Sequence, residues 1–148
     1  MNMERQKYIE EQKNNYIEEV KKYFFSYVGY SSEEIDSLRG ENSFFIDLDQ
    51  MAEEDNIFDF LRRYLPLDPE LNKQNILKKN WDALSDSIGG GMILSAESND
   101  VVYVLTGFEK FSNQYPEAWE FLSILYDNVS YIKDDEDIKN SVSVHVYK

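Results

Sequence analysis

The sequence contains no cysteine and only one histidine, His145, among its 148 residues. The absence of thiols excludes disulfide bonds, thiolate catalysis and cysteine metal ligands. His145 lies on a predicted edge strand without a nearby carboxylate or nucleophile, and such a histidine is usually a surface or half-buried residue. We therefore assign it no role.

Basic residues are also scarce, since 15 lysines and arginines stand against 29 aspartates and glutamates. The net charge of −14 opposes binding to nucleic acid or anionic lipid and favours a basic protein as the partner. Long hydrophobic runs are missing, and the charged first residues lack the apolar core of a secretion signal. We therefore expect a cytoplasmic protein, monomeric when free, that contacts neither membrane nor nucleic acid.

The hydrophobic content of 42% is enough for one well-packed domain with an extension. Apolar residues recur at helical spacing from Glu4 to about Val28, which predicts a long amphipathic helix. Residues 31–34 have the pattern of a capping box, which predicts a short helix through Leu38 that Gly40 ends. Residues 1–40 are thus a predicted helical extension, packed on a domain of residues 41–148.

Predicted strands alternate with helices in residues 41–148. Apolar runs at 44–48 and 101–105 predict strands buried on both faces, the second in the middle of the sheet, and the alternation at 142–146 predicts an edge strand. One helix should begin at Asp55 or Asn56 and end at Pro66, and another should begin at Pro116. Residues 67–79 and the acidic run 134–137 are predicted loops. This order indicates an α/β fold with a small three-stranded parallel sheet.

The most informative segment is residues 80–91, Asn-Trp-Asp-Ala-Leu-Ser-Asp-Ser-Ile-Gly-Gly-Gly. Asn80 can cap a helix by accepting the backbone N–H of Ala83, and the three glycines are predicted to end this helix. Helical spacing predicts a core stripe of Trp81, Leu84 and Ile88 beside an outward stripe of Asp82, Asp86 and Gly89. The two carboxylates repel each other, and no cation on the same predicted helix lies four residues from either of them. Bare glycine backbone beside them would let a partner approach closely. The segment therefore predicts a docking surface for a cation-rich partner.

The pattern Asn-Trp-Asp-Ala-Leu-x-Asp, followed by a hydrophobic residue and glycines, resembles the signature helix of the barstar family. Members of that family are small proteins that block the active sites of microbial ribonucleases. The resemblance implies a barstar-like fold for residues 41–148, with helices on one face of the sheet. Because both faces of the first two predicted strands are apolar, we expect the extension to cover the other face.

The resemblance also implies a function. Asp82 and Asp86 would mimic substrate phosphates against the Arg, Lys and His side chains of a nuclease, and no cofactor, metal or catalytic residue is implied. The further partner-binding residues would be Asn80, Gly89, Gly90 and Asp127, although an acid such as Asp127 is more often an ordinary surface residue. The protein would then be an inhibitor, acting as an antitoxin or immunity protein against a basic ribonuclease or nuclease toxin domain.

The sequence departs from the family pattern at several positions. Ile76, Leu77 and Ser85 stand where the family prototype has aromatic residues, and the glycine run replaces a Thr-Gly-Trp-like segment. Aromatic residues are the usual hot spots of interfaces, so we expect a different nuclease as the partner. A second hypothesis is a generic acidic interaction module that shares the fold and binds another basic protein.

An enzyme is the third hypothesis. Residues 44–49 resemble the strand and Asp-x-Asp opening of Mg²⁺-dependent haloacid-dehalogenase-type phosphatases, with Asp47 as nucleophile and Asp49 handling a proton. Residues 104–106 could pass for the second motif of that family and residues 133–135 for its last two. However, this chain has the lysine and the metal-binding acids in one run, where the family keeps them on separate elements. Met51 also replaces the usual Thr or Val, so we expect no enzyme.

Overall fold

The computed structural model describes residues 32–40, 42–115 and 117–147, together with several residues between 3 and 18. Those between 3 and 18 are helical, as predicted. The rest of the predicted helix from Glu4 to Val28 lies outside the described residues, and so does the expected capping residue Ser31. The packing of the extension on the sheet therefore stays a prediction, which a chain starting near Gly40 with full solubility and stability would refute.

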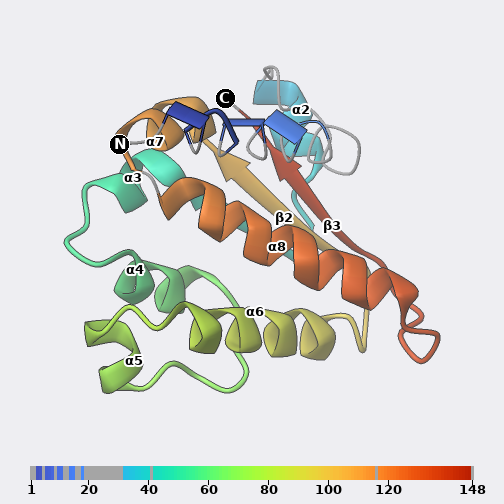
Figure 1. The fold of residues 1–148 in the computed structure, drawn as a ribbon. Coiled ribbons are helices and arrows are strands. Elements are labelled where there is room, and N and C mark those ends of the chain that lie inside the picture. Colours follow the sequence, from blue (N-terminus) through green and yellow to red (C-terminus); the bar gives the residue numbers. More distant parts are fainter. Residues whose placement is uncertain are drawn as a thin grey trace.

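Three parallel strands form the sheet (Figure 1). They are β1 (Ser43–Asp47), β2 (Val101–Thr106) and β3 (Val142–Val146), in the order β1-β2-β3. This confirms the predicted middle position of β2 and the predicted edge position of β3. The register pairs Val101 with Val142 at one end of the strands and Asp47 with Thr106 at the other.

Seven helices are assigned within residues 32–147: α2 (Ser32–Ser37), α3 (Leu48–Ala52), α4 (Ile57–Tyr64), α5 (Lys73–Leu77), α6 (Trp81–Ser95), α7 (Phe108–Gln114) and α8 (Glu117–Asp134). The helix predicted from Asn56 to Pro66 is α4, and the Asn56 side chain accepts the backbone N–H of Phe58 at 2.9 Å. The short helices α3, α5 and α7 were not predicted, and α5 lies in the predicted loop of residues 67–79. None of the helices formed by the described residues has both the length and the apolar character that a membrane span requires.

The core lies between the sheet and the two longest helices. α8 crosses in front of β2 and β3, and α6 runs beside α8 (Figure 1). The alternation predicted in β3 is confirmed, because its three valines are buried while Ser143 and His145 are half-buried. The prediction for β1 is only partly right. Ile46 is buried, but Phe44 and Phe45 are half-buried because β1 is an edge strand, and the Arg39 guanidinium stacks over the Phe45 ring at 4.2 Å.

Candidate partner-binding surface

The direction of α6 is set by the corner that joins it to α5. The Asn80 N–H donates to the carbonyl oxygen of Asn75 at 3.0 Å, and the Lys79 N–H donates to that of Ile76 at 3.3 Å. Lys79 has a positive φ of 49°. These features define a Schellman motif, in which the residue after the helix adopts the left-handed conformation. Asn80 is the last residue of this motif, so no linker separates the two helices.

Asn80 also begins the next helix. Its side-chain Oδ1 accepts the backbone N–H of Ala83 at 3.1 Å, as predicted from the sequence. The corner is held against the rest of the domain by Asn56, whose Nδ2 donates to the carbonyl oxygen of Ile76 at 2.7 Å. The first turn of α6 therefore starts from a position that hydrogen bonds fix on both sides.

The first two turns of α6 expose the two aspartates. Asp82 and Asp86 are both exposed, while Leu84 is fully buried and Trp81 is half-buried with its ring 5.0 Å from Phe58 in an edge-to-face arrangement. This confirms the predicted core stripe and the outward orientation of the acids. Neither carboxylate forms an ion pair with any residue that the structure describes. Two negative charges one helical turn apart are thus open to solvent.

The prediction that the glycines end the helix is wrong. α6 continues through Gly89, Gly90 and Gly91 to Ser95, and none of the three has a positive φ. A Cβ on Gly90 would overlap the carbonyl oxygen of Asp68, and one on Gly91 would overlap that of Pro66. Residues 66–68, which we call the strap, therefore cross α6 at its backbone. The glycines therefore serve to permit this close approach, and they do not end the helix.

The backbone of Gly89 and Gly90 is consequently not bare. The strap covers Gly90, and the Asp68 N–H donates to the Ser87 carbonyl oxygen at 2.9 Å. Gly89 is buried under the Asn128 side chain, whose Oδ1 would overlap a Cβ at this position. The expectation that a partner approaches exposed glycine backbone is therefore wrong, because other parts of the same chain already occupy that space.

Asp127 lies on the helix that flanks α6. It is exposed on α8 and precedes Asn128, whose Nδ2 donates to the Ser85 carbonyl oxygen at 3.2 Å and to the Ile124 carbonyl oxygen at 3.0 Å. The Asn128 side chain thus joins the two helices between the acidic turns and the glycines. Asp127 is thus an exposed acid on a helix that packs against α6, and its role in binding stays a prediction.

An apolar side chain is exposed at the end of α5, the helix that precedes α6. Leu77, at the end of α5, is 69% exposed, whereas the preceding Ile76 is half-buried against the core. Its position three residues before Asn80 puts it at the corner where α6 begins. The corner before the acidic turns of α6 therefore exposes an apolar side chain.

The structure brings together only some of the residues of the phosphatase hypothesis. Asp47 ends β1 beside Thr106, and its Oδ1 accepts the Asp49 N–H at 3.0 Å as the cap of α3. Residues 133–135 lie where α8 ends at Asp134, and from there the chain returns to Val142 at the opposite edge of the sheet (Figure 1). Among the described residues, no group of three or more His, Asp or Glu side chains could hold a metal ion.

Comparisons with protein-family models, with characterised proteins and with solved structures find no match for this chain.

Proposed function

We propose that this protein is a stoichiometric inhibitor of a basic microbial ribonuclease or nuclease toxin domain, and that it acts as an antitoxin or immunity protein. The observation that carries the proposal is the pair of exposed carboxylates at Asp82 and Asp86, which lack ion-pair partners among the described residues and project from a helix with a fixed start. Arg, Lys and His side chains that bind phosphate groups in a nuclease also bind carboxylates. The acidic turns of α6 would therefore occupy the place of the substrate.

The charge distribution supports the same proposal. Residues 41–100 contain 13 acidic and 5 basic residues, a net charge of −8 within a total of −14. The excess is concentrated in the part of the chain that contains α6. A field of this kind accelerates encounter with a basic partner and orients it before contact.

The nearest competing function is a generic acidic interaction module. It rests on the same two carboxylates, so surface charge alone does not separate the two. Inhibition of a nuclease separates them, because a module that binds another basic protein leaves nuclease activity unchanged. The test partner is the basic nuclease domain encoded beside this protein or, in its absence, a panel of purified small basic microbial ribonucleases.

The decisive variant is Asp86→Ala, measured for thermal stability and for inhibition of the same nuclease. We expect unchanged or slightly raised stability, because the substitution relieves repulsion from Asp82. We expect inhibition to weaken by about 2–5 kcal/mol, mainly through faster dissociation, because the cations of the nuclease lose their counter-charge.

Asp55→Ala is the matched control, since Asp55 is an exposed acid in the loop before α4. It should leave both quantities unchanged. A loss of stability in Asp86→Ala would make Asp86 a structural residue. Full inhibition by Asp86→Ala would place the binding surface elsewhere.

A further inference from the structure

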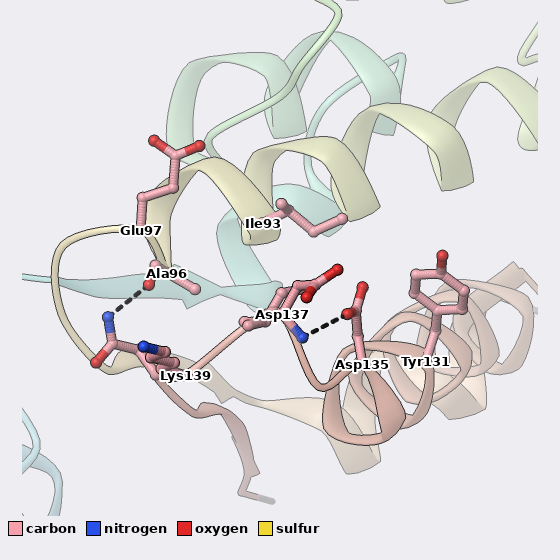
Figure 2. Close-up of a pocket in the computed structure, with 9 residues that line it drawn as sticks. Ile93, Ala96, Glu97, Tyr131, Asp135, Asp137 and Lys139 are labelled. Atoms are coloured by element: carbon pink, nitrogen blue, oxygen red, sulfur yellow. Dashed lines mark hydrogen bonds between the residues drawn. The ribbon is translucent and has the colours of Figure 1, made fainter.

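A cavity of about 440 Å³ lies at the far end of α6 from the corner. Three parts of the chain line it: the last turn of α6, the last turns of α8 and the loop of residues 135–140 that leads to β3 (Figure 2). An interior cavity of about 150 Å³ holds a benzene ring, so this one has room for a long side chain. It also falls within the usual size range of ligand pockets.

The walls of this cavity combine apolar and acidic groups. Tyr131 is 65% exposed on one side, and Ile93 is half-buried on the other. Figure 2 shows the carboxylates of Asp135 and Asp137 directed into the space between them. The cavity therefore offers an aromatic ring, an aliphatic wall and two carboxylates to the same occupant.

Hydrogen bonds shape the cavity before anything binds. The Asn140 Nδ2 donates to the Ala96 carbonyl oxygen at 2.6 Å, which ties the loop to the end of α6. The Asp137 N–H donates to Asp135 Oδ1 at 2.9 Å, which orders the turn that carries both acids. A site that is formed in advance requires little ordering on binding.

The charge of the cavity selects a cation. Glu97, Asp135 and Asp137 line it together with one base, Lys139, so their net charge is −2. None of these four side chains forms an ion pair with a residue that the structure describes. A guanidinium group pairs with carboxylates and stacks on an aromatic face, while its alkyl stem packs on an apolar wall.

The cavity faces the same side as the acidic turns of α6. Ile93 follows Asp82 by eleven residues, which returns to the same side of the helix about 17 Å further along. A standard interface buries about 800 Å² on each partner, a patch about 30 Å across, so one partner can cover both places. We infer that this cavity binds an arginine side chain of the basic partner that docks on Asp82 and Asp86; the identity of that partner rests on the proposed function.

The cavity can be tested without the partner. N-acetyl-arginine amide is titrated into the isotope-labelled protein and followed by NMR, with N-acetyl-citrulline amide as an isosteric neutral probe. We expect the arginine compound alone to shift the resonances of Ile93, Ala96 and Tyr131. In the variant Asp135→Asn/Asp137→Asn, which retains oxygen acceptors at both positions, these shifts should disappear. Equal shifts with both compounds, or shifts spread over all exposed acids, would overturn the inference.

The role in partner binding has its own control. The double variant Asp135→Asn/Asp137→Asn should weaken nuclease binding about tenfold, as expected when two partly exposed charge contacts are lost. Glu53→Gln/Asp55→Asn removes the same charge from the exposed loop before α4 and should have no such effect. Unchanged nuclease affinity in the first variant would refute the partner role. Failure of Asp86→Ala to reduce inhibition would instead refute the proposed function, while the titration with the arginine compound would still stand.

Discussion

The two halves of α6 differ in what surrounds them. The first two turns carry Asp82 and Asp86 into solvent, without an ion-pair partner among the described residues. The third turn consists of Gly89, Gly90 and Gly91, pressed against Asn128 and the strap so closely that a single methyl group would collide. The first two turns are therefore open to solvent, whereas the glycine turn fixes their position.

The continuous segment of residues 80–91 therefore has two separate roles, one for its acids and one for its glycines. The acids contribute little to the interior of the domain, because they touch none of it. The glycines contribute little to the outer surface, because the chain itself buries Gly89 and Gly91 and partly covers Gly90. We therefore expect two groups of variants at different positions in α6. Substitutions of the acids should change binding, and substitutions of the glycines should change the free energy of unfolding.

Gly91→Ala is the variant with the largest expected effect on stability. Inside an ordinary helix, alanine is more stable than glycine by about 1 kcal/mol. Here the new Cβ overlaps the main-chain carbonyl oxygen of Pro66, which cannot rotate away, so we expect a loss of about 3 kcal/mol or more. Gly90→Ala should behave alike because of the Asp68 carbonyl oxygen. Urea denaturation measures both.

Two other glycines serve as controls for this prediction. Gly40→Ala should be nearly neutral, since nothing lies within 4 Å of the position of its Cβ. Gly89→Ala should lose less than Gly91→Ala, because the atom it meets is the end of the flexible Asn128 side chain. A Gly91→Ala protein as stable as the wild type would show that the strap does not hold the third turn.

Tyr103→Phe tests a polar group that is buried in the sheet, in contrast to the exposed acids of α6. The Tyr103 hydroxyl is fully buried and lacks a hydrogen-bond partner in the described part of the chain, the reverse of the exposed carboxylates on α6. A buried polar group without a partner costs about 1–3 kcal/mol, so its removal should raise the free energy of unfolding by about 1 kcal/mol. Tyr131→Phe is the exposed control and should change stability little. A clear loss of stability in Tyr103→Phe would indicate a partner for the hydroxyl.

The same residue predicts a pH dependence. Burial raises the pKa of the Tyr103 phenol above its ordinary value of 10.0. Above that pH the phenol ionises in the unfolded chain but stays protonated in the folded one, so the folded state binds more protons and becomes less stable as the pH rises. The wild-type protein should therefore lose more stability between neutral pH and pH values above about 10 than Tyr103→Phe does. Equal slopes for the two proteins would contradict this.

Lys79→Gly tests the corner between α5 and α6, which precedes the turns that carry Asp82 and Asp86. The left-handed conformation costs a residue with a side chain about 1–2 kcal/mol, and glycine avoids this cost while losing more entropy on folding. We expect a net gain of about 0.5–1 kcal/mol in thermal or urea denaturation. Lys78→Gly is the matched control, because Lys78 has an ordinary right-handed helical conformation and should gain nothing.

The smallest effect on stability is expected for Asp82→Asn/Asp86→Asn. Removing both charges relieves their repulsion and should change the free energy of unfolding by at most about 0.5 kcal/mol. Association with the nuclease should nevertheless become slower and less dependent on salt, since charge steers the encounter. Stopped-flow measurements at low and high ionic strength test this. A large loss of stability would show that the two acids, like the glycines, are needed for the fold.

The strands and the longer helices could be predicted from the sequence because local patterns determine them. The alternation of Val142, Val144 and Val146 and the Asn56 and Asn80 caps required no knowledge of tertiary contacts. Short helices such as α3 and α5 have too few residues to show a period. Lys79 in a left-handed conformation was also unexpected, since nothing local marks a lysine for that role.

The candidate surface was predicted in part. The outward orientation of Asp82 and Asp86 follows from their spacing to Leu84 and Ile88. The covering of Gly89 and Gly90 did not follow, because it is made by residues 66–68 and 128, which lie outside this helix in the sequence. The cavity beside Tyr131 combines three segments and is visible only when the chain is folded.

The strap also affects how this protein can diverge. Substitutions at positions 82 and 86 should leave the fold intact, so under the proposed function descendants would acquire a new partner through single changes that selection for stability does not remove. A substitution at position 90 or 91 requires a simultaneous rearrangement of residues 66–68. Specificity should therefore drift along the open turns of α6, while the crossing of the strap over the helix persists in every member that still folds.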